Sequence, residues 1–235
     1  MVCFLVFLIT PATGSATSLW VDVLTPRSHD KVGRFEYQGK IPDEMEIYHG
    51  RFEDSEGGIY GAIVKPLDTR EMTTYEHFNK QEYRHQFVPR FFGIIRSADT
   101  ADIVLERLPG KTVRQFIIPD KADGSTRAAR KTQLNEFGDQ IFQVMQMLWD
   151  EGFTHGDLHS GNVLIDKESR QVSLIDFEFS RFHQDRNNMG DFIVLDAIKS
   201  IHLQPLLLPR VKTYLDERKM SVSFSFQHYV KPSPM

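Results

Sequence analysis

Thr154-His155-Gly156-Asp157-Leu158-His159-Ser160-Gly161-Asn162-Val163-Leu164-Ile165, followed by Leu174-Ile175-Asp176-Phe177-Glu178-Phe179, is the stretch that decides the fold. It contains an Asp, an Asn five residues later and a second Asp nineteen residues after the first, each beside short apolar runs typical of strands. Phosphoryl transfer uses a carboxylate to orient the attacking hydroxyl, and an amide and a carboxylate to hold magnesium on the nucleotide phosphates. The stretch therefore predicts a phosphoryl-transfer site.

Each of the three polar residues has a proposed role. Asp157 is the candidate that accepts a hydrogen bond from the substrate hydroxyl and takes its proton late in the transfer. Asn162 and Asp176 are the candidate magnesium ligands, because magnesium combines one or two protein oxygens with phosphate and water. Taken singly, each residue would also suit a surface turn or a cap. Their spacing resembles that of a known family of phosphotransferases, which favours the functional interpretation.

The segment resembles the catalytic loop and metal-binding turn of the protein-kinase-like superfamily, His-x-Asp-x-x-x-x-Asn followed by Asp-Phe-x. The resemblance covers about 37 to 215. It implies an α+β, two-lobed protein-kinase-like fold with an antiparallel β N-terminal lobe, one helix in that lobe, and a short, mainly helical C-terminal lobe. It also implies ATP and Mg²⁺ as cofactors, and a structural role for His155 beneath the loop. Asp191 resembles the helix-start Asp that braces the catalytic-loop backbone, although an N-terminal helix cap would look identical.

Upstream segments extend the resemblance. Lys65 resembles the strand lysine that contacts the α- and β-phosphates. Its acidic partner on the next helix is Glu71, which fits the apolar spacing, or Glu76, which lies at a more usual separation; we favour Glu71 narrowly. The segment from Val104 to Gly110 resembles the hinge, where the backbone carbonyl of Glu106 and the amide of Leu108 would bind adenine.

Local patterns predict four segments along the chain: an apolar leader at 1–17, a β-rich lobe at 18–107, a helical lobe at 108–220 and a tail at 221–235. Asp68-Thr69-Arg70-Glu71 reads as a capping box that opens the helix after Lys65. Apolar residues at helical spacing predict one long helix from about Thr126 to Glu151. Further expected elements are strands at 20–24, 35–37, 45–52, 59–65, 91–95 and 103–106 and helices near 191–201 and 206–218.

Composition narrows the class of protein. The chain has 235 residues, one cysteine (Cys3) and a formal net charge of -4, so neither an intramolecular disulfide nor broad nucleic-acid binding is indicated. No apolar run approaches the ~18 residues that span a bilayer. We expect a cytoplasmic protein; secretion is the alternative, because Val2 to Thr10 followed by small residues could form a signal peptide, although no basic residue precedes Arg27. The oligomeric state stays open.

Departures from the family pattern bear on function. No Gly-x-Gly-x-x-Gly precedes Lys65, Gly156 replaces the Arg that regulated protein kinases carry, and Glu178 replaces the Gly of Asp-Phe-Gly. Asp191 follows Asp176 by only fifteen residues, with no Ala-Pro-Glu between them. These features resemble RIO-type, aminoglycoside-phosphotransferase-like and choline-kinase-like kinases.

We therefore predict an ATP-dependent phosphotransferase that moves the γ-phosphoryl group to a hydroxyl acceptor, with an atypical protein Ser/Thr kinase slightly favoured. The alternatives are a small-molecule kinase of the aminoglycoside or choline kinase type, and a non-catalytic, nucleotide-binding pseudokinase or interaction module. The sequence does not identify the hydroxyl-bearing acceptor.

Overall fold

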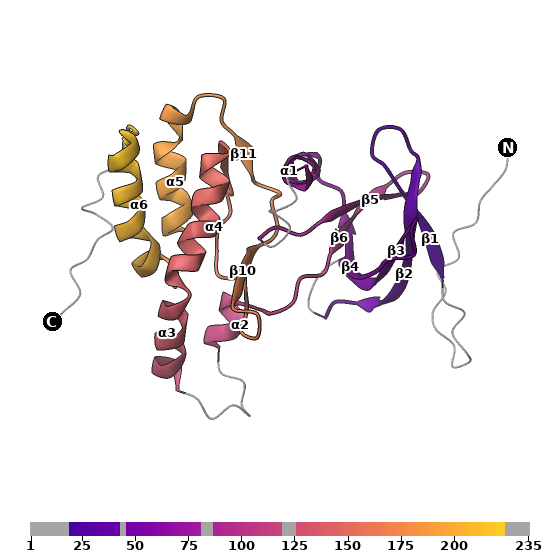
Figure 1. The fold of residues 1–235 in the computed structure, drawn as a ribbon, viewed down its shortest axis with the longest axis horizontal. Helices are drawn as coiled ribbons and strands as arrows, with labels where there is room; N and C mark the ends of the chain where they lie inside the picture. The colour runs from indigo at the N-terminus through magenta and orange to yellow at the C-terminus, as the bar shows by residue number, and fades with distance from the viewer. Residues whose placement is uncertain (1–18, 43–45, 81–86, 119–125, 224–235) are drawn as a thin grey trace.

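The computed structural model describes residues 19–42, 46–80, 87–118 and 126–223. Figure 1 shows two lobes, one made of strands and one mainly of helices. The predicted α+β fold with an antiparallel N-terminal sheet is confirmed. The predicted leader lies outside the described residues, as does the predicted tail beyond residue 223. Within the described ranges, no helix combines the length and the apolar character that crossing a bilayer requires.

The N-terminal lobe is a closed antiparallel barrel with the strand order β1-β2-β3-β4-β6-β5. Burial alternates along β4, where Ala62 and Val64 are buried between more exposed neighbours, as a strand with one packed face requires. The barrel closes where Leu24 of β1 pairs with Ile94 of β5. Gly93 is needed at this junction, because it has φ +147° and an added Cβ would lie 2.6 Å from the Leu24 carbonyl oxygen. The strands are β1 (Trp20–Leu24), β2 (Lys31–Lys40), β3 (Tyr48–Asp54), β4 (Ile59–Pro66), β5 (Phe91–Arg96) and β6 (Ala101–Glu106).

One helix, α1 (Thr69–Asn79), follows β4 and lies between the barrel and the helical lobe (Figure 1). Only the N-cap half of the predicted capping box is confirmed, since the Asp68 side chain accepts hydrogen bonds from the amides of Arg70 and Glu71. The Glu71 carboxylate bonds Lys65 and the Phe177 amide instead of closing the box. At the other end, the Asn79 side chain bonds both the amide and the carbonyl of Phe91 at the start of β5. These two attachments fix the helix against the sheet.

The C-terminal lobe packs helices around two short sheets. Between the lobes, residues 107–110 connect β6 to β7; the boundary at residue 107 stays a prediction. The elements are β7 (Lys111–Thr112), α2 (Val113–Ile117), α3 (Arg127–Glu136), α4 (Gly138–Asp150), β8 (Phe153–Thr154), β9 (Val163–Asp166), β10 (Gln171–Leu174), β11 (Arg181–Phe182), the 3₁₀ helix η2 (Arg186–Met189), α5 (Gly190–Ile198) and α6 (Gln204–Arg218).

The prediction of a single helix from Thr126 to Glu151 is wrong. Two helices, α3 and α4, are present instead, and they meet at Phe137. The Phe137 amide donates to the carbonyl of Leu134, three residues back instead of four, and its backbone sits at φ -93°, ψ -2°. The following Gly138 has a weak helix propensity and lies against Leu206 and Arg210 of α6. The apolar periodicity continues across this break, so the pattern does not reveal it.

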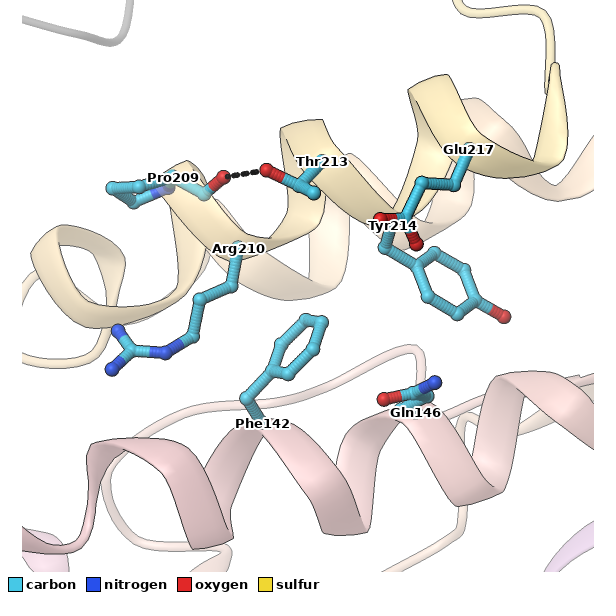
Figure 2. A pocket seen from close by; sticks show the side chains of 7 residues that line it. All are labelled: Phe142, Gln146, Pro209, Arg210, Thr213, Tyr214 and Glu217. Carbon is cyan, nitrogen blue, oxygen red and sulfur yellow. Dashed lines mark hydrogen bonds between the residues drawn. The ribbon is translucent and has the colours of Figure 1, made fainter.

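A hollow of about 500 Å³ lies between α4 and α6 (Figure 2). Pro209 has no amide proton for an intrahelical bond, and the Thr213 hydroxyl donates to its carbonyl oxygen at 3.3 Å. This hollow contains none of the predicted site residues, so its size alone does not mark a functional site. It is lined by Phe142, Gln146, Pro209, Arg210, Thr213, Tyr214 and Glu217.

Candidate active site

A cleft of about 280 Å³ between the lobes collects most of the predicted site residues. Six of them line it: Lys65, Glu71, Glu106, Leu108, Asn162 and Asp176. Its lining also contains residues that the sequence did not single out, among them Ile41 and Ile47. The Ile41 amide donates to the Ile47 carbonyl at 2.9 Å, which joins the two ends of the turn between β2 and β3. Residues 43–45 of this turn lie outside the described residues.

Lys65 on β4 is held by two carboxylates. Its Nζ lies 3.0 Å from Oε2 of Glu71 and 2.7 Å from Oδ1 of Asp176. Burial favours the neutral amine, yet the two carboxylates together raise the pKa of Lys65 above its ordinary value, so the side chain is a cation. Burial also raises the pKa of Glu71, and the positive charge of Lys65 offsets part of this increase. Of the two candidate partners, the structure pairs Glu71 with Lys65, whereas Glu76 pairs with Arg27 at 3.5 Å.

The turn after β10 places Asp176 in the cleft and Phe177 in the core. Asp176 has a φ of 66°, in the left-handed region that few residues other than glycine adopt. Phe177 is fully buried, with its ring 5.3 Å from that of Tyr75 on α1. Its amide donates to Oε1 of Glu71 at 3.3 Å. Glu71 therefore links α1 to both the lysine and the Asp176 turn.

The catalytic loop is fixed by its own polar residues. The Asn162 side chain donates to the Asp157 carbonyl at 3.0 Å, and the Asn162 carbonyl accepts from the Ile175 amide at 3.0 Å. His155 is fully buried beside Phe177; its Nε2 bonds the Ile175 carbonyl at 2.9 Å, and its Nδ1 accepts from the Asp157 amide at 3.4 Å. One neutral tautomer satisfies both bonds, in agreement with burial that lowers the pKa of His155 to about 4.

Asp191 was predicted to brace the backbone of this loop, and that prediction is wrong. Asp191 accepts hydrogen bonds from the amide and hydroxyl of Ser223, so it holds the segment after α6. Asp196, one turn further along α5, instead accepts from the amides of His155 (2.9 Å) and Gly156 (2.8 Å). Burial raises the pKa of Asp196 to about 6. A lone Asp inside the apolar run from Val194 to Ile198 was the sequence signal for this role, because a buried carboxylate requires hydrogen-bond donors.

Asp157 presents its carboxylate at the edge of the loop, 30% exposed. Lys199, at the end of α5, lies 2.9 Å from its Oδ1, and Nε2 of His159 lies 3.6 Å from its Oδ2. Lys199 was not recognisable in the sequence as a partner of Asp157, because forty-two residues separate the two. The carboxylate is therefore accessible and partly neutralised.

Gly156 is required by the path of the loop. It has φ +77°, and an added Cβ would lie 2.0 Å from the carbonyl oxygen of Phe179. Any side chain at this position would displace the backbone that follows Asp176. The arginine of regulated protein kinases is therefore incompatible with this conformation of the loop.

The hinge segment follows β6. The Glu106 amide donates to the Arg90 carbonyl at 2.8 Å, and the Arg107 amide donates to the Gly61 carbonyl at 2.9 Å. Within the described part of the chain, the Leu108 amide makes no hydrogen bond. An amide on the wall of an apolar cleft is a suitable donor for a planar heterocycle.

The comparisons with known proteins agree with this architecture. Residues 65–197 match the protein kinase domain family. Similar curated proteins include the serine/threonine-protein kinase ppk25 of Schizosaccharomyces pombe, 31% identical over 135 residues that make up 56% of this chain and 30% of that protein. The tyrosine-protein kinase JAK1 of Danio rerio is 25% identical over 175 residues, 68% of this chain and 14% of that protein.

Among solved structures, the kinase PK-1 of Cydia pomonella granulovirus is similar with a TM-score of 0.48 and 10% identity, over 64% of this chain and 53% of that one. The chain spans less than a third of either curated relative. The family match covers more than half of the chain, from the strand lysine through the catalytic loop to α5. This chain belongs to the protein kinase domain family.

Proposed function

We propose that the protein is an ATP-dependent phosphotransferase that transfers the γ-phosphoryl group to a hydroxyl acceptor. The observation that carries this proposal is the assembled contact of Lys65 with both Glu71 and Asp176 in the cleft between the lobes. Catalysis in protein kinases requires both the lysine–glutamate pair and the metal-binding Asp to be in place. The simultaneous contact of Lys65 with Glu71 and Asp176 supports the proposal.

The cleft residues suit magnesium and a nucleotide. Asp176 offers a partly exposed carboxylate, and Asn162 offers an amide oxygen, since its NH₂ group already donates to Asp157. Two hard oxygen donors in a phosphate-binding cleft are typical of magnesium, which supplies charge neutralisation and orientation of the phosphates. Lys65 would bind phosphate oxygens, with Glu71 fixing its ammonium. The Leu108 amide and the Glu106 carbonyl would bind the adenine edge.

The transfer step then depends on Asp157. Its carboxylate accepts a hydrogen bond from the acceptor hydroxyl, orients it toward the γ-phosphorus and takes its proton late in the reaction. Neutral His155 and buried Asp196 hold the loop backbone at this position. Positioning of this kind is the main contribution of a protein to phosphoryl transfer.

For the acceptor we favour a protein Ser or Thr. The match to a serine/threonine-protein kinase supports this choice. A small alcohol is the alternative, because the chain between Asp176 and Asp191 contains only the two-residue strand β11 and the short helix η2 and leaves little room for peptide docking. Incubation with Mg²⁺-ATP and either casein or a panel of aminoglycosides and amino alcohols distinguishes the two.

The deciding experiment measures thermal stability with ATP, with and without magnesium, for the wild type and Asp176→Asn. Binding to the folded state at a hundredfold excess over Kd stabilises it by about 2.7 kcal/mol. We expect a magnesium-dependent shift in the wild type that Asp176→Asn abolishes. Asp157→Asn should keep the shift and lower turnover by roughly 10²- to 10⁴-fold. Absence of any nucleotide shift in the wild type would refute the proposal and favour a non-catalytic module.

A further inference from the structure

Lys199 makes an unusual double contact with the catalytic loop. It is the C-cap residue of α5, and its ammonium donates both to the carbonyl of Gly156 and to Oδ1 of Asp157, the latter at 2.9 Å. These two acceptors belong to adjacent residues, one on the backbone and one on the side chain. A single cation therefore restrains both the path of the loop and the rotamer of the Asp157 carboxylate.

The loop itself supplies no such cation. The segment 154–162 contains no Lys or Arg. His159 lies 3.6 Å from Oδ2 of Asp157, too far for a hydrogen bond, and its Nδ1 accepts from the Gly161 amide. Among the described contacts, Oδ2 of Asp157 accepts no hydrogen bond. The two oxygens thus differ: Oδ1 accepts a hydrogen bond from Lys199, whereas Oδ2 lies 3.6 Å from Nε2 of His159 and accepts none among the described contacts.

A lysine at a helix C-terminus also stabilises the helix dipole. That role would require only proximity to the last carbonyls of α5. In this structure the ammonium instead reaches across to the loop, and its side chain remains 40% exposed. Exposure next to a reacting carboxylate is of use in a transfer reaction, because the charge stays accessible to substrate.

We propose that Lys199 is a positioning residue for phosphoryl transfer, holding Oδ1 of Asp157 so that Oδ2 receives the proton of the acceptor. This inference rests on the proposed function. In the step, the acceptor oxygen bonds to the γ-phosphorus while the bond from that phosphorus to the β–γ bridging oxygen breaks, leaving its electron pair on ADP. The acceptor O–H bond breaks, and its proton passes to Oδ2. Lys199 forms and breaks no covalent bond.

The test compares Lys199→Met, which keeps the length of the side chain without its charge, with Lys199→Arg, which keeps the charge. Lys212→Met is the matched control, because Lys212 is an exposed lysine on α6 whose ion pair is with Asp216, four residues away, and not with the catalytic loop. Steady-state rates with Mg²⁺-ATP are measured with casein and with water as acceptors, together with the thermal shift by Mg²⁺-ATP. We expect Lys199→Met to lower kcat by roughly 10- to 100-fold with KM for ATP and the thermal shift nearly unchanged. Lys199→Arg should recover most of the loss.

A second comparison separates action through Asp157 from a general structural role. In single-turnover reactions, Lys199→Met should add little to the loss already caused by Asp157→Asn, because residues that act as a unit are not additive. Full kcat in Lys199→Met, equal losses in the Met and Arg variants, or a multiplicative double variant would each overturn the inference while leaving the proposed function intact. A wild type with neither a magnesium-dependent thermal shift nor turnover of either acceptor overturns both.

Discussion

Replacing Gly156 by Ala should disrupt the joint between the catalytic loop and the Asp176 turn. Two costs arise from the structure. An L-residue at φ +77° costs roughly 1–2 kcal/mol. In addition, the new Cβ lies 2.0 Å from the Phe179 carbonyl oxygen, so that backbone must retreat by roughly an ångström or more to reach ordinary contact. Overpacking of this kind typically adds about 1–3 kcal/mol. We expect a total loss of about 3 kcal/mol in the free energy of unfolding.

Gly57→Ala is the matched control. Gly57 has a similar φ of +87° in the turn between β3 and β4, but an added Cβ would meet nothing within 4 Å. Its substitution therefore measures the backbone cost alone, about 1 kcal/mol. Urea unfolding at 25 °C, followed by the fluorescence of Trp149 in the core of the helical lobe, gives both values. If Gly156→Ala and Gly57→Ala are equally destabilising, the clash with Phe179 does not exist and the reasoning fails.

Two further predictions follow from the site. Glu71→Gln should raise KM for ATP and lower turnover by roughly tenfold or more, because Lys65 loses the buried carboxylate that holds its ammonium. The control variant Glu76→Gln should change KM and turnover by less than about twofold, because Glu76 lies in a more exposed ion pair. Steady-state kinetics checks this, and equal effects of the two variants would contradict it. The second concerns pH. Burial lowers the pKa of His155 to about 4, so acidification from pH 6.5 towards 4 protonates the unfolded chain first and removes stability. Burial raises the pKa of Asp196 to about 6, so between pH 6 and 3.8 the folded chain takes up a proton first and gains stability. Asp196→Asn removes this compensation, and its free energy of unfolding should fall about 2 kcal/mol further than that of the wild type between pH 7 and 4. Parallel urea-derived curves for the two proteins would refute the assignment.

Most of the fold and the centre of the site follow from local patterns. Burial alternates with period two along β4, and Asp68 occupies the cap position at which α1 begins. The choice of Glu71 over Glu76 depended on helical phase, which sequence spacing records. Asn162 and Asp176 were recognisable because their spacing from Asp157, beside short apolar runs, is like that of the family, and Lys65 because it resembles the family's strand lysine. Such arguments need only a few neighbouring residues.

The features that sequence analysis missed depend on which distant elements pack together. Asp191 and Asp196 both lie on α5, and only the packing of that helix beneath the loop decides which carboxylate meets the amides of His155 and Gly156. Lys199 was equally hidden, since its acceptors lie more than forty residues upstream. The break between α3 and α4 at Phe137 was hidden for the same reason. The local apolar periodicity continues across it, and the residue that follows it packs against the distant helix α6.

Closure of the N-terminal barrel restricts how other proteins can engage this lobe. An open sheet offers a row of unpaired amides and carbonyls, and many peptides bind by adding a strand to such an edge. Here β1 and β5, the two strands that would otherwise be outermost, pair through Leu24 and Ile94. A peptide that added a strand at this position would first have to displace the pairing of β1 with β5, which consists of this one residue pair. Regulators of this lobe are therefore expected to recognise side chains on α1 or on the strand surfaces, and not the backbone of a sheet edge.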